Sequence, residues 1–290
     1  MKIALFGNLF QTRKNASVVE VIDKAVQSGA EIVIEKDFSA FIREKLNKDI
    51  SSFEIAESKD ITADYAISMG GDGTFLNTAA AIRERNIPIL GINTGRLGFL
   101  ADVSPDFIDT ALEMLFNGEC RIEQRTLIEA KKDGMPFTTY PFALNEVAVL
   151  KHDNSSLIEV NTHVNGELLA NFIADGIIVC TPTGSTGYSL SVGGPIIEPR
   201  SGTFCISAVA PHSLNVRPVI LCDDAEIKLT VHSRSHHFLI SVDGRSESHA
   251  DQTTITLRRA PYTIGVVKVM HKVFYDTLRD KMMWGVDQRF

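Results

Sequence analysis

The sequence predicts an α/β protein in which a doubly wound N-terminal domain with a parallel sheet precedes a β-rich domain. Over residues 1–100, short apolar runs alternate with segments of helical periodicity, as in a parallel sheet covered by helices on both faces. Later in the chain, apolar and polar residues alternate with a period of two, which is typical of antiparallel strands. We expect domains at 1–100 and 101–270, the first completed by a helix at about 271–290.

The elements of the first domain are read from these patterns in chain order. Buried strands are predicted at 2–7, 30–36, 64–69 and 87–93, and helices at 16–29, 38–48 and 74–85. The first helix places Val18, Ile22 and Val26 on one stripe and ends at Gly29.

Turn and cap residues punctuate the rest of the chain. Ser104 as N-cap and Pro105 at the first helical position predict a helix over 105–117. Strands are predicted around 158–164 and 227–231, and hairpins at Asp133-Gly134 and Asn165-Gly166. The segment 273–285 predicts an amphipathic helix that packs on the first domain.

Composition limits the functional classes. A net charge of −7 argues against a general nucleic-acid partner, and the apolar runs are too short to span a bilayer. The N-terminus resembles a strand more than a signal peptide, so we expect a cytoplasmic protein. The four cysteines are widely spaced and are expected to be buried thiols.

The stretch GGDGT, Gly70 to Thr74, stands between a predicted strand and a helix, where open α/β sheets bind ligands. It fits neither the G-x-G-x-x-G nor the Walker A pattern. Its glycines and helix N-terminus favour an anion, yet Asp72 would repel a phosphate by about 4 kcal/mol at close range. A divalent cation, or a substrate hydroxyl whose proton Asp72 accepts, would resolve this conflict; alternatively, Asp72 only caps the helix.

Two further stretches carry polar residues suited to a ligand. Within residues 174–195 a buried strand runs into a loop with four hydroxyl residues (Thr181, Thr183, Ser185 and Thr186), two glycines and Tyr188, which suits a polar ligand. Asn145 and Glu146 begin another strand, suited to a ribose or a base edge. The alternatives without a ligand are an ordinary Ser/Thr-rich turn for the first stretch and an exposed strand end for Asn145 and Glu146. Asp243-Gly244 is interpreted as a turn.

In combination these stretches resemble the NAD kinase family. The matching residues are GGDGT (70–74), GINTGRLGFLADV (91–103), Asn145-Glu146, DGIIVCTPTGSTGYSLSVGGP (175–195), SLNVRP (213–218), Val242-Asp243-Gly244 and the closing YDTLRDKMMWG. The resemblance implies transfer of phosphate from ATP to the 2′-hydroxyl of the adenosine ribose of NAD, giving NADP. It also implies a divalent cation such as Mg²⁺, held mainly through the ATP phosphates, and a homodimer or homotetramer.

By position, the resemblance assigns Asp72 as the catalytic residue that faces the acceptor hydroxyl. The residues that it assigns to NAD binding are Asp72, Gly73, Phe75, Asn145, Glu146, Asp175, Thr183, Thr186, Gly187, Tyr188 and Ser191. Those that it assigns to the ATP phosphates are Gly70, Gly71, Gly73, Thr74 and Asn93. The family loop often has Ala where this chain has Gly187, a change that adds backbone freedom.

Two other functions compete with this interpretation. A lipid or sphingoid-base kinase shares the GGDG loop, but it predicts an apolar cleft or a basic amphipathic surface, and neither is visible in the sequence. A non-enzymatic dinucleotide sensor would keep the ligand contacts without needing Asp72. NADP formation from NAD and ATP, with Asp72→Asn alongside, discriminates the three.

Overall fold

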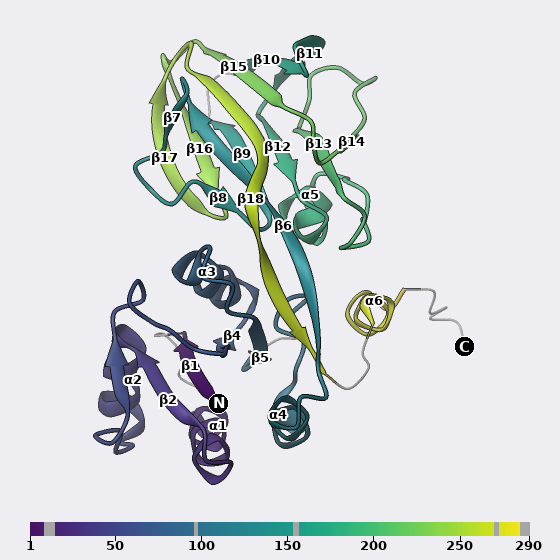
Figure 1. Ribbon diagram of the computed structural model, residues 1–290. Helices are drawn as coiled ribbons and strands as arrows, with labels where there is room; N and C mark the ends of the chain where they lie inside the picture. The colour runs from purple at the N-terminus through teal and green to yellow at the C-terminus, as the bar shows by residue number, and fades with distance from the viewer. Residues whose placement is uncertain (9–14, 96–97, 153–156, 270–272, 285–290) are drawn as a thin grey trace. The chain divides into compact units, whose positions relative to one another are not determined.

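The computed structural model describes residues 1–8, 15–95, 98–152, 157–269 and 273–284, and the chain forms two compact units (Figure 1). Unit 1 is Met1–Gln124 with Ile264–Phe290, and unit 2 is Arg125–Thr263. The domain limit predicted at residue 100 differs from this division. Helix α4 (Ile108–Phe116) lies in unit 1, because it buries Ile108 and Leu112 in that unit's core.

Unit 1 is built on a parallel sheet. Its strands are β1 (Lys2–Gly7), β2 (Glu31–Glu35), β3 (Glu54–Ala56), β4 (Tyr65–Gly70) and β5 (Ile89–Asn93), in the order β5-β4-β1-β2-β3. Every pair in this order is parallel, and the end of β18 joins the edge through Val266 opposite Ile89. The predicted doubly wound half is confirmed. Strand β3 was not predicted, because a strand of three residues is too short to show a clear sequence pattern.

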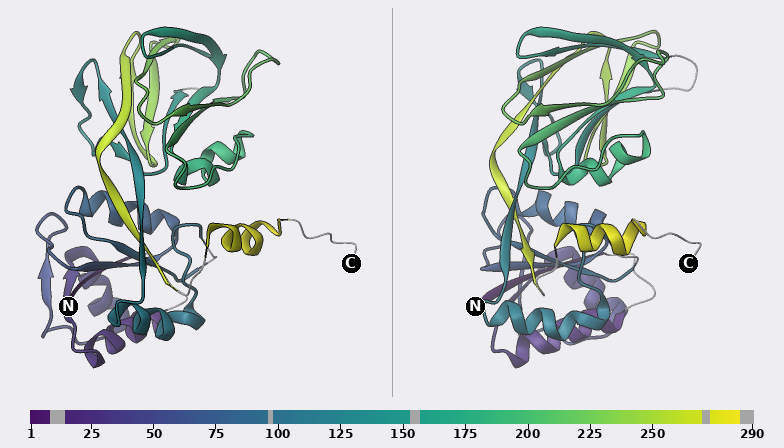
Figure 2. Two further views of the ribbon diagram at one scale, coloured as in Figure 1. Left: turned by 45° about the vertical axis from the view of Figure 1, so that its right-hand side comes forward. Right: turned by 90° about the vertical axis from the view of Figure 1, so that its right-hand side faces the viewer.

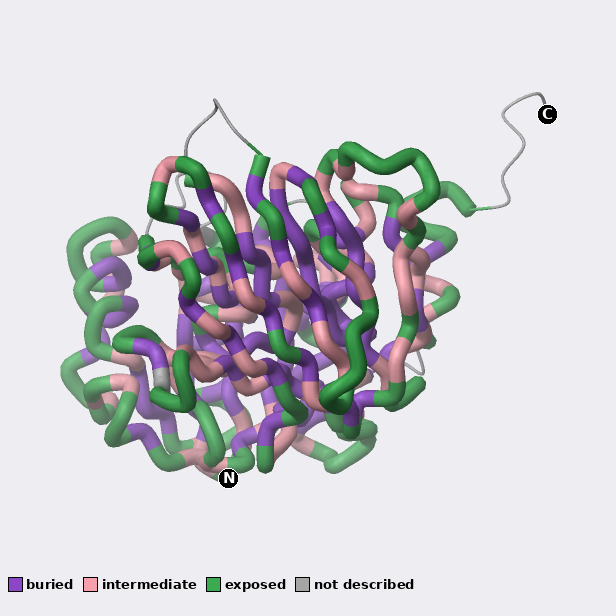
Figure 3. The backbone as a smooth tube through the Cα atoms, turned by 90° about the horizontal axis from the view of Figure 1, so that it is seen from above, coloured by how far each residue is buried: buried purple, intermediate pink, exposed green. Residues whose placement is uncertain are grey.

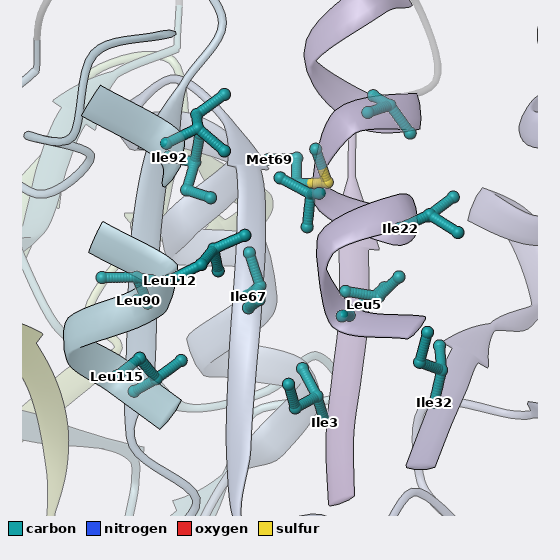
Figure 4. Close-up of a cluster of buried hydrophobic side chains, with 14 of the residues drawn as sticks. Ile3, Leu5, Ile22, Ile32, Ile67, Met69, Leu90, Ile92, Leu112 and Leu115 are labelled. Carbon is teal, nitrogen blue, oxygen red and sulfur yellow. The ribbon is translucent and has the colours of Figure 1, made fainter. Parts of the chain in front are cut away.

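Helices cover both faces of this sheet. α1 (Asn15–Gln27), α2 (Lys36–Leu46) and α4 bury apolar side chains with those of the strands, among them Ile67 and Met69 of β4 (Figure 4). Ser68 points to the opposite face, where Thr78 of α3 (Asp72–Ile82) donates a hydrogen bond to it at 3.0 Å. α6 (Phe274–Met282), predicted at 273–285, belongs to unit 1.

Two helix starts differ from the sequence prediction. α3 begins at Asp72 rather than at residue 74, with Gly71 at the N-cap. Pro105 begins a 3-10 turn, η1 (Pro105–Phe107), and Ser104 makes no side-chain cap to it, so the α-helix itself starts at Ile108. Helix propensity does not distinguish a 3-10 first turn from an α-helical one, which explains this difference.

Unit 2 contains two antiparallel sheets. One comprises β10 (Ile158–Val164), β11 (Glu167–Ala174), β15 (Ile227–Ser233) and β18 (Thr254–Lys268), with β6 (Arg121–Lys132), β7 (Met135–Pro136) and β8 (Phe142–Ala143) alongside. The other has the order β14-β13-β12-β9-β16-β17. Its strands are β9 (Glu146–Lys151), β12 (Gly176–Cys180), β13 (Thr203–Val209), β14 (Val219–Cys222), β16 (His237–Val242) and β17 (Arg245–Ala250).

The two sheets of unit 2 enclose an apolar core that includes Val149, Val179 and Leu229. The long strands β6 and β18 pair with each other (Figure 2). In Figure 3 the buried residues follow the strands, whereas exposed residues gather on loops and outer turns. Two short elements, η2 (Thr183–Thr186) and α5 (Tyr188–Ser191), follow β12.

Both predicted hairpins are confirmed. Asp133 and Gly134 have φ of 47° and 78° between β6 and β7, and Asn165 and Gly166 have φ of 51° and 85° between β10 and β11. Positive φ at both central residues is the type I′ geometry that matches strand twist.

The expectation of buried cysteines is correct for two of the four. Cys180 and Cys205 are buried, but Cys222 is exposed because it ends the edge strand β14. No helix among the described residues is long and apolar enough to cross a bilayer.

Candidate active site

Asp72 stands at the turn between β4 and α3 in unit 1, and its carboxylate is held by another loop. Oδ2 accepts a hydrogen bond from the backbone N–H of Phe99 at 2.9 Å. Oδ1 accepts from the N–H groups of Leu100 and Ala101 at 3.0 and 3.1 Å. The helix-cap interpretation of Asp72 is therefore wrong: it is the first residue of α3, and its acceptors serve residues 99–101.

The loop that follows β5 is fixed so that these three amides face Asp72. Asn93, 1% exposed at the end of β5, accepts from the N–H of Gly95 at 2.7 Å and donates Nδ2 to the carbonyl of Ala101 at 3.3 Å. The phosphate contact predicted for Asn93 stays a prediction; in the structure Asn93 fixes the loop whose amides bind Asp72. Arg96 and Leu97, part of the 91–103 motif, lie outside the described residues.

Gly98 leaves the space that the Asp72 carboxylate occupies. A Cβ at residue 98 would lie 1.9 Å from Asp72 Oδ1, so Gly98→Ala is expected to rotate the carboxylate away from its amides. A displacement of about 1 Å at a reacting group costs on the order of 100-fold in turnover, and we expect that loss in kcat with NAD and ATP. Gly95→Ala is the matched control, since its Cβ would meet nothing nearer than 3.9 Å. Wild-type turnover in Gly98→Ala would contradict this account.

A cavity of about 470 Å³ adjoins the other side of the GGDGT turn. It is lined by Gly71, Gly73 and Thr74, together with the ends of β1 and β2 and with Asn77, Thr78 and Ala81 of α3. A Cβ at Gly71 or Gly73 would meet nothing within 4 Å, so the backbone is open to close approach there. With the N-terminus of an 11-residue helix beside it, this turn suits a phosphate. Gly70 packs closely on Thr74, since a Cβ at residue 70 would lie 2.2 Å from Thr74 Oγ1, and its predicted phosphate contact stays a prediction.

The C-terminal helix α6 brings a cation to the same carboxylate. Lys281 Nζ lies 3.9 Å from Asp72 Oδ2 and 4.3 Å from the ring centroid of Phe99. Both charged side chains are about one third exposed, at 32% and 31%. Among the described residues, the positive neighbour of Asp72 thus comes from a segment more than two hundred residues later in the chain.

In unit 2, Asn145 and Glu146 are held by Asp243. The Asp243 carboxylate accepts from the N–H groups of Leu144, Asn145 and Glu146 at 2.7, 2.9 and 3.0 Å. Asp243 and Gly244 have φ of 47° and 80° in the predicted turn, here between β16 and β17. The turn interpretation is correct but incomplete, because the side chain also fixes the backbone of the predicted ribose-binding pair.

The loop after β12 is joined to this pair. Thr181 donates Oγ1 to the carbonyl of Leu144 at 2.5 Å and its N–H to the carbonyl of Asn145 at 2.9 Å. A Cβ at Gly184 would lie 2.1 Å from the Asn145 carbonyl oxygen, so only glycine permits this approach. Gly187 faces Glu146, whose Oε2 would be 3.0 Å from a Cβ there. The structure therefore brings together Asn145, Glu146 and residues 181–188.

Two acceptors of this cluster are buried without a hydrogen-bond partner in the structure: Asn145 Oδ1 and Glu146 Oε2. Buried polar groups normally pair, so adjacent orphans are typical of a site that awaits donors from a ligand. Burial raises the pKa of Glu146 to about 7; the Asp243 carboxylate adds to this rise, and the N–H of Tyr188 opposes it.

The raised pKa of Glu146 predicts a pH-dependent stability. An unfolded Glu loses its proton near pH 4.3, whereas the folded chain keeps it until about pH 7. The folded state binds more protons over that window, so the free energy of unfolding falls as pH rises from about 4.5 to 7. Glu146→Gln is expected to remove about 2–3 kcal/mol of this fall, measured by urea unfolding at pH 5 and pH 8. Exposed Glu167→Gln is the control; a parallel pH profile for Glu146→Gln and the wild type would contradict the prediction.

Some predicted residues lie elsewhere. Asp175 is at the opposite end of β12 from the cluster, a span of five residues and roughly 17 Å, and pairs with Lys151 at 2.6 Å. Phe75 is 0% exposed in the core of unit 1. Of the remaining loop residues, Thr183 is 8% exposed, Thr186 and Gly187 are half-buried, and Tyr188 and Ser191 are exposed. NAD contacts for these residues stay predictions.

Sequence reasoning missed the roles of Asp243, Lys281 and residues 99–101. An Asp-Gly turn between strands is common, so its carboxylate gave no separate signal. Lys281 lies within the closing motif, but nothing in the sequence indicated a contact with Asp72. Among the described residues, no group of three or more His, Cys, Asp or Glu side chains is placed to hold a metal ion.

Comparisons with known proteins identify the family. The ATP-NAD kinase N-terminal domain matches residues 11–120, and the ATP-NAD kinase C-terminal domain matches residues 144–269. A NAD kinase of Bacteroides fragilis is 48% identical over 289 residues, covering 100% of both chains. A NAD kinase of Porphyromonas gingivalis is 42% identical, covering 99% of each.

Two solved structures share the fold. The crystal structure of yeast NADH kinase complexed with NADH has a TM-score of 0.88 at 22% identity, covering 99% of this chain and 89% of that one. The crystal structure of an NAD kinase from Archaeoglobus fulgidus in complex with ATP has a TM-score of 0.75 at 25% identity, covering 98% of each chain. With full-length relatives at this identity, the chain belongs to the NAD kinase family, whose reaction is the ATP-dependent phosphorylation of NAD to NADP.

Proposed function

We propose that this chain carries out the reaction of its family with Asp72 as the catalytic base. The observation that carries the proposal is the Asp72 carboxylate, fixed by three backbone amides beside a glycine turn that is open to phosphate. Because its side chain is 31% exposed, it is accessible to a substrate hydroxyl. Phosphoryl transfer depends mainly on positioning and on charge stabilisation, and this arrangement supplies both.

The reaction step is a displacement at the γ-phosphorus of ATP. The ribose 2′-oxygen forms a bond to phosphorus, the bond from phosphorus to the bridging oxygen breaks, and ADP leaves with that oxygen. Asp72 orients the hydroxyl and accepts its proton as the new bond forms. In a loose transition state the proton leaves only once the bond to phosphorus is well advanced.

The donor phosphates are assigned to the GGDGT turn. Gly71, Gly73 and Thr74 line the cavity there, and the helix N-terminus favours negative charge. Glu35 and Asp37 also line it, so a phosphate needs a neutralising partner. A divalent cation such as Mg²⁺, carried mainly by the ATP phosphates, supplies that charge when bound.

In unit 2 we assign Asn145 and Glu146 to the adenosine part of NAD. Their orphaned buried acceptors suit the hydroxyl and amino donors of a nucleoside. Thr183, Thr186, Gly187 and Tyr188 complete the proposed contacts from the adjoining loop. We further propose a cytoplasmic homodimer or homotetramer, the state implied by the family resemblance.

The test supplies purified protein with NAD, ATP and Mg²⁺ and measures NADP by an NADP-specific dehydrogenase. NADP formation is expected, and omission of Mg²⁺ should abolish it. A sphingoid base or diacylglycerol offered in place of NAD separates this function from a lipid kinase. Binding of NAD without turnover would instead support a dinucleotide sensor.

A further inference from the structure

The Asp72 carboxylate carries an unequal load of hydrogen bonds. A carboxylate has about four acceptor positions, two on each oxygen. Oδ1 uses both for the amides of Leu100 and Ala101, whereas among the described residues Oδ2 accepts from Phe99 alone. Oδ2 is therefore the oxygen with a position open to a substrate hydroxyl, and it is also the oxygen next to Lys281, at 3.9 Å.

Lys281 is placed there by the packing of its helix. Phe274, Leu278 and Lys281 follow one another at the spacing that puts residues on one face of a helix. Leu278 is buried, and the Phe274 ring lies 6.3 Å from the Phe99 ring. Lys281 Nζ completes the contact at 4.3 Å from the same ring, a cation–π distance. The residue that donates to Oδ2 is thus also the one that anchors α6.

The geometry of the Lys281–Asp72 pair is better suited to compensating charge at the site than to stabilising the fold. A separation of 3.9 Å is too long for a hydrogen bond, and partly exposed ion pairs contribute little to folding. An approaching phosphate, however, brings negative charge toward Asp72. Within the described residues, Lys281 is the one cation within 4.0 Å of that carboxylate. Its charge offsets the repulsion that would otherwise turn the carboxylate away.

We propose that Lys281 is a positioning residue of the phosphoryl-transfer site, which holds the Asp72 carboxylate aimed at the acceptor hydroxyl when the donor phosphates bind. The C-terminal helix is therefore part of the reaction machinery rather than only a cover for unit 1. This inference rests on the proposed role of Asp72.

The kinetic test replaces the charge and keeps the bulk. Lys281→Gln is expected to lower kcat about tenfold to thirtyfold and to change the KM for NAD less than about twofold. The reason is that the cation is needed only when the donor phosphates bring negative charge toward Asp72. Lys281→Arg should recover most of the loss. Arg279→Gln is the matched control on the same helix, since Arg279 pairs with Asp276 of its own helix. Thermal melting of each variant verifies folding.

A double-mutant cycle identifies the route of the effect. If Lys281 acts through Asp72, adding Lys281→Gln to Asp72→Asn changes the residual turnover by less than about twofold. Additive losses, or a rise of more than tenfold in the KM for ATP alone, would show direct contact with the donor phosphates and overturn the positioning role. Unchanged kcat in Lys281→Gln would also overturn it.

A measurement without substrates separates this inference from the proposed function. Amide ¹H–¹⁵N resonances of Phe99, Leu100 and Ala101 report on the carboxylate that they bind. Lys281→Gln in the full chain is expected to shift them, and Arg279→Gln is not. If Lys281→Gln shifts these resonances but the wild-type chain forms no NADP, the function is refuted and the coupling stands. If Lys281→Gln leaves them unshifted and the wild-type chain is active, the coupling alone is refuted.

Discussion

Asp72→Asn is expected to lower NADP formation by about 1,000-fold while NAD still binds. A positioned general base contributes on the order of 10²- to 10⁴-fold, and an amide cannot accept the proton of the acceptor hydroxyl. The asparagine also has an NH₂ group in place of one carboxylate oxygen. If this NH₂ takes the place of Oδ2, it faces the N–H of Phe99, and two donors then point at each other. We therefore expect a stability loss of about 1–2 kcal/mol besides the catalytic loss.

The measurement combines initial rates with NAD binding by calorimetry. Binding within about threefold of the wild type, with turnover nearly lost, separates catalysis from folding. Asp106→Asn is the control, since Asp106 is an exposed acid in the same unit. A folded Asp72→Asn protein that turns over within about tenfold of the wild type would remove Asp72 from the catalytic role.

Asp243→Asn is expected to produce the largest loss of stability among these substitutions. Its carboxylate accepts three backbone N–H groups, and an amide can present an oxygen to only part of this set. Leaving a buried donor unpaired costs about 1–3 kcal/mol, and loss of a charged acceptor adds to it, so we expect about 3 kcal/mol. Asn tolerates positive φ, so the turn itself is not the cause.

The same change is expected to raise the KM for NAD about tenfold, because Asn145 and Glu146 lose the anchor that orients them. Urea unfolding and steady-state kinetics measure the two effects. Asp133→Asn is a matched control: Asp133 also has φ of 47° before a glycine in a hairpin turn, but its side chain accepts only from the N–H of Thr254, at 2.9 Å on the surface. Equal effects of the two substitutions would contradict the anchoring role.

Asp72 in unit 1 and Asp243 in unit 2 are carboxylates with different hydrogen-bonding roles. Asp72 is partly exposed and its three amides leave one acceptor position open, which suits a group that must meet a substrate. The Asp243 carboxylate accepts hydrogen bonds from three backbone N–H groups, which suits a group that fixes the backbone of its neighbours. Glu146, beside it, has a pKa raised to about 7 by burial and lies within the proposed nucleoside contacts.

The sequence alone determined the parallel α/β half, both hairpins and the place of the GGDGT stretch where a strand gives way to a helix. These features depend on local periodicity and on turn residues, which neighbouring letters reveal. The GGDGT turn, the Asn145-Glu146 pair and the loop near 181–188 were likewise visible as motifs. Their spacing and order supplied the family resemblance.

Only the tertiary structure decided how these motifs are held. The amides of residues 99–101 bind Asp72, Asp243 reaches back about one hundred residues to Leu144–Glu146, and Lys281 meets Asp72 across most of the chain. It also separated Asp175 from the loop that follows it by the length of β12. Such contacts arise from chain crossings and helix packing, and a one-dimensional pattern carries no record of which distant backbone donor a carboxylate will find.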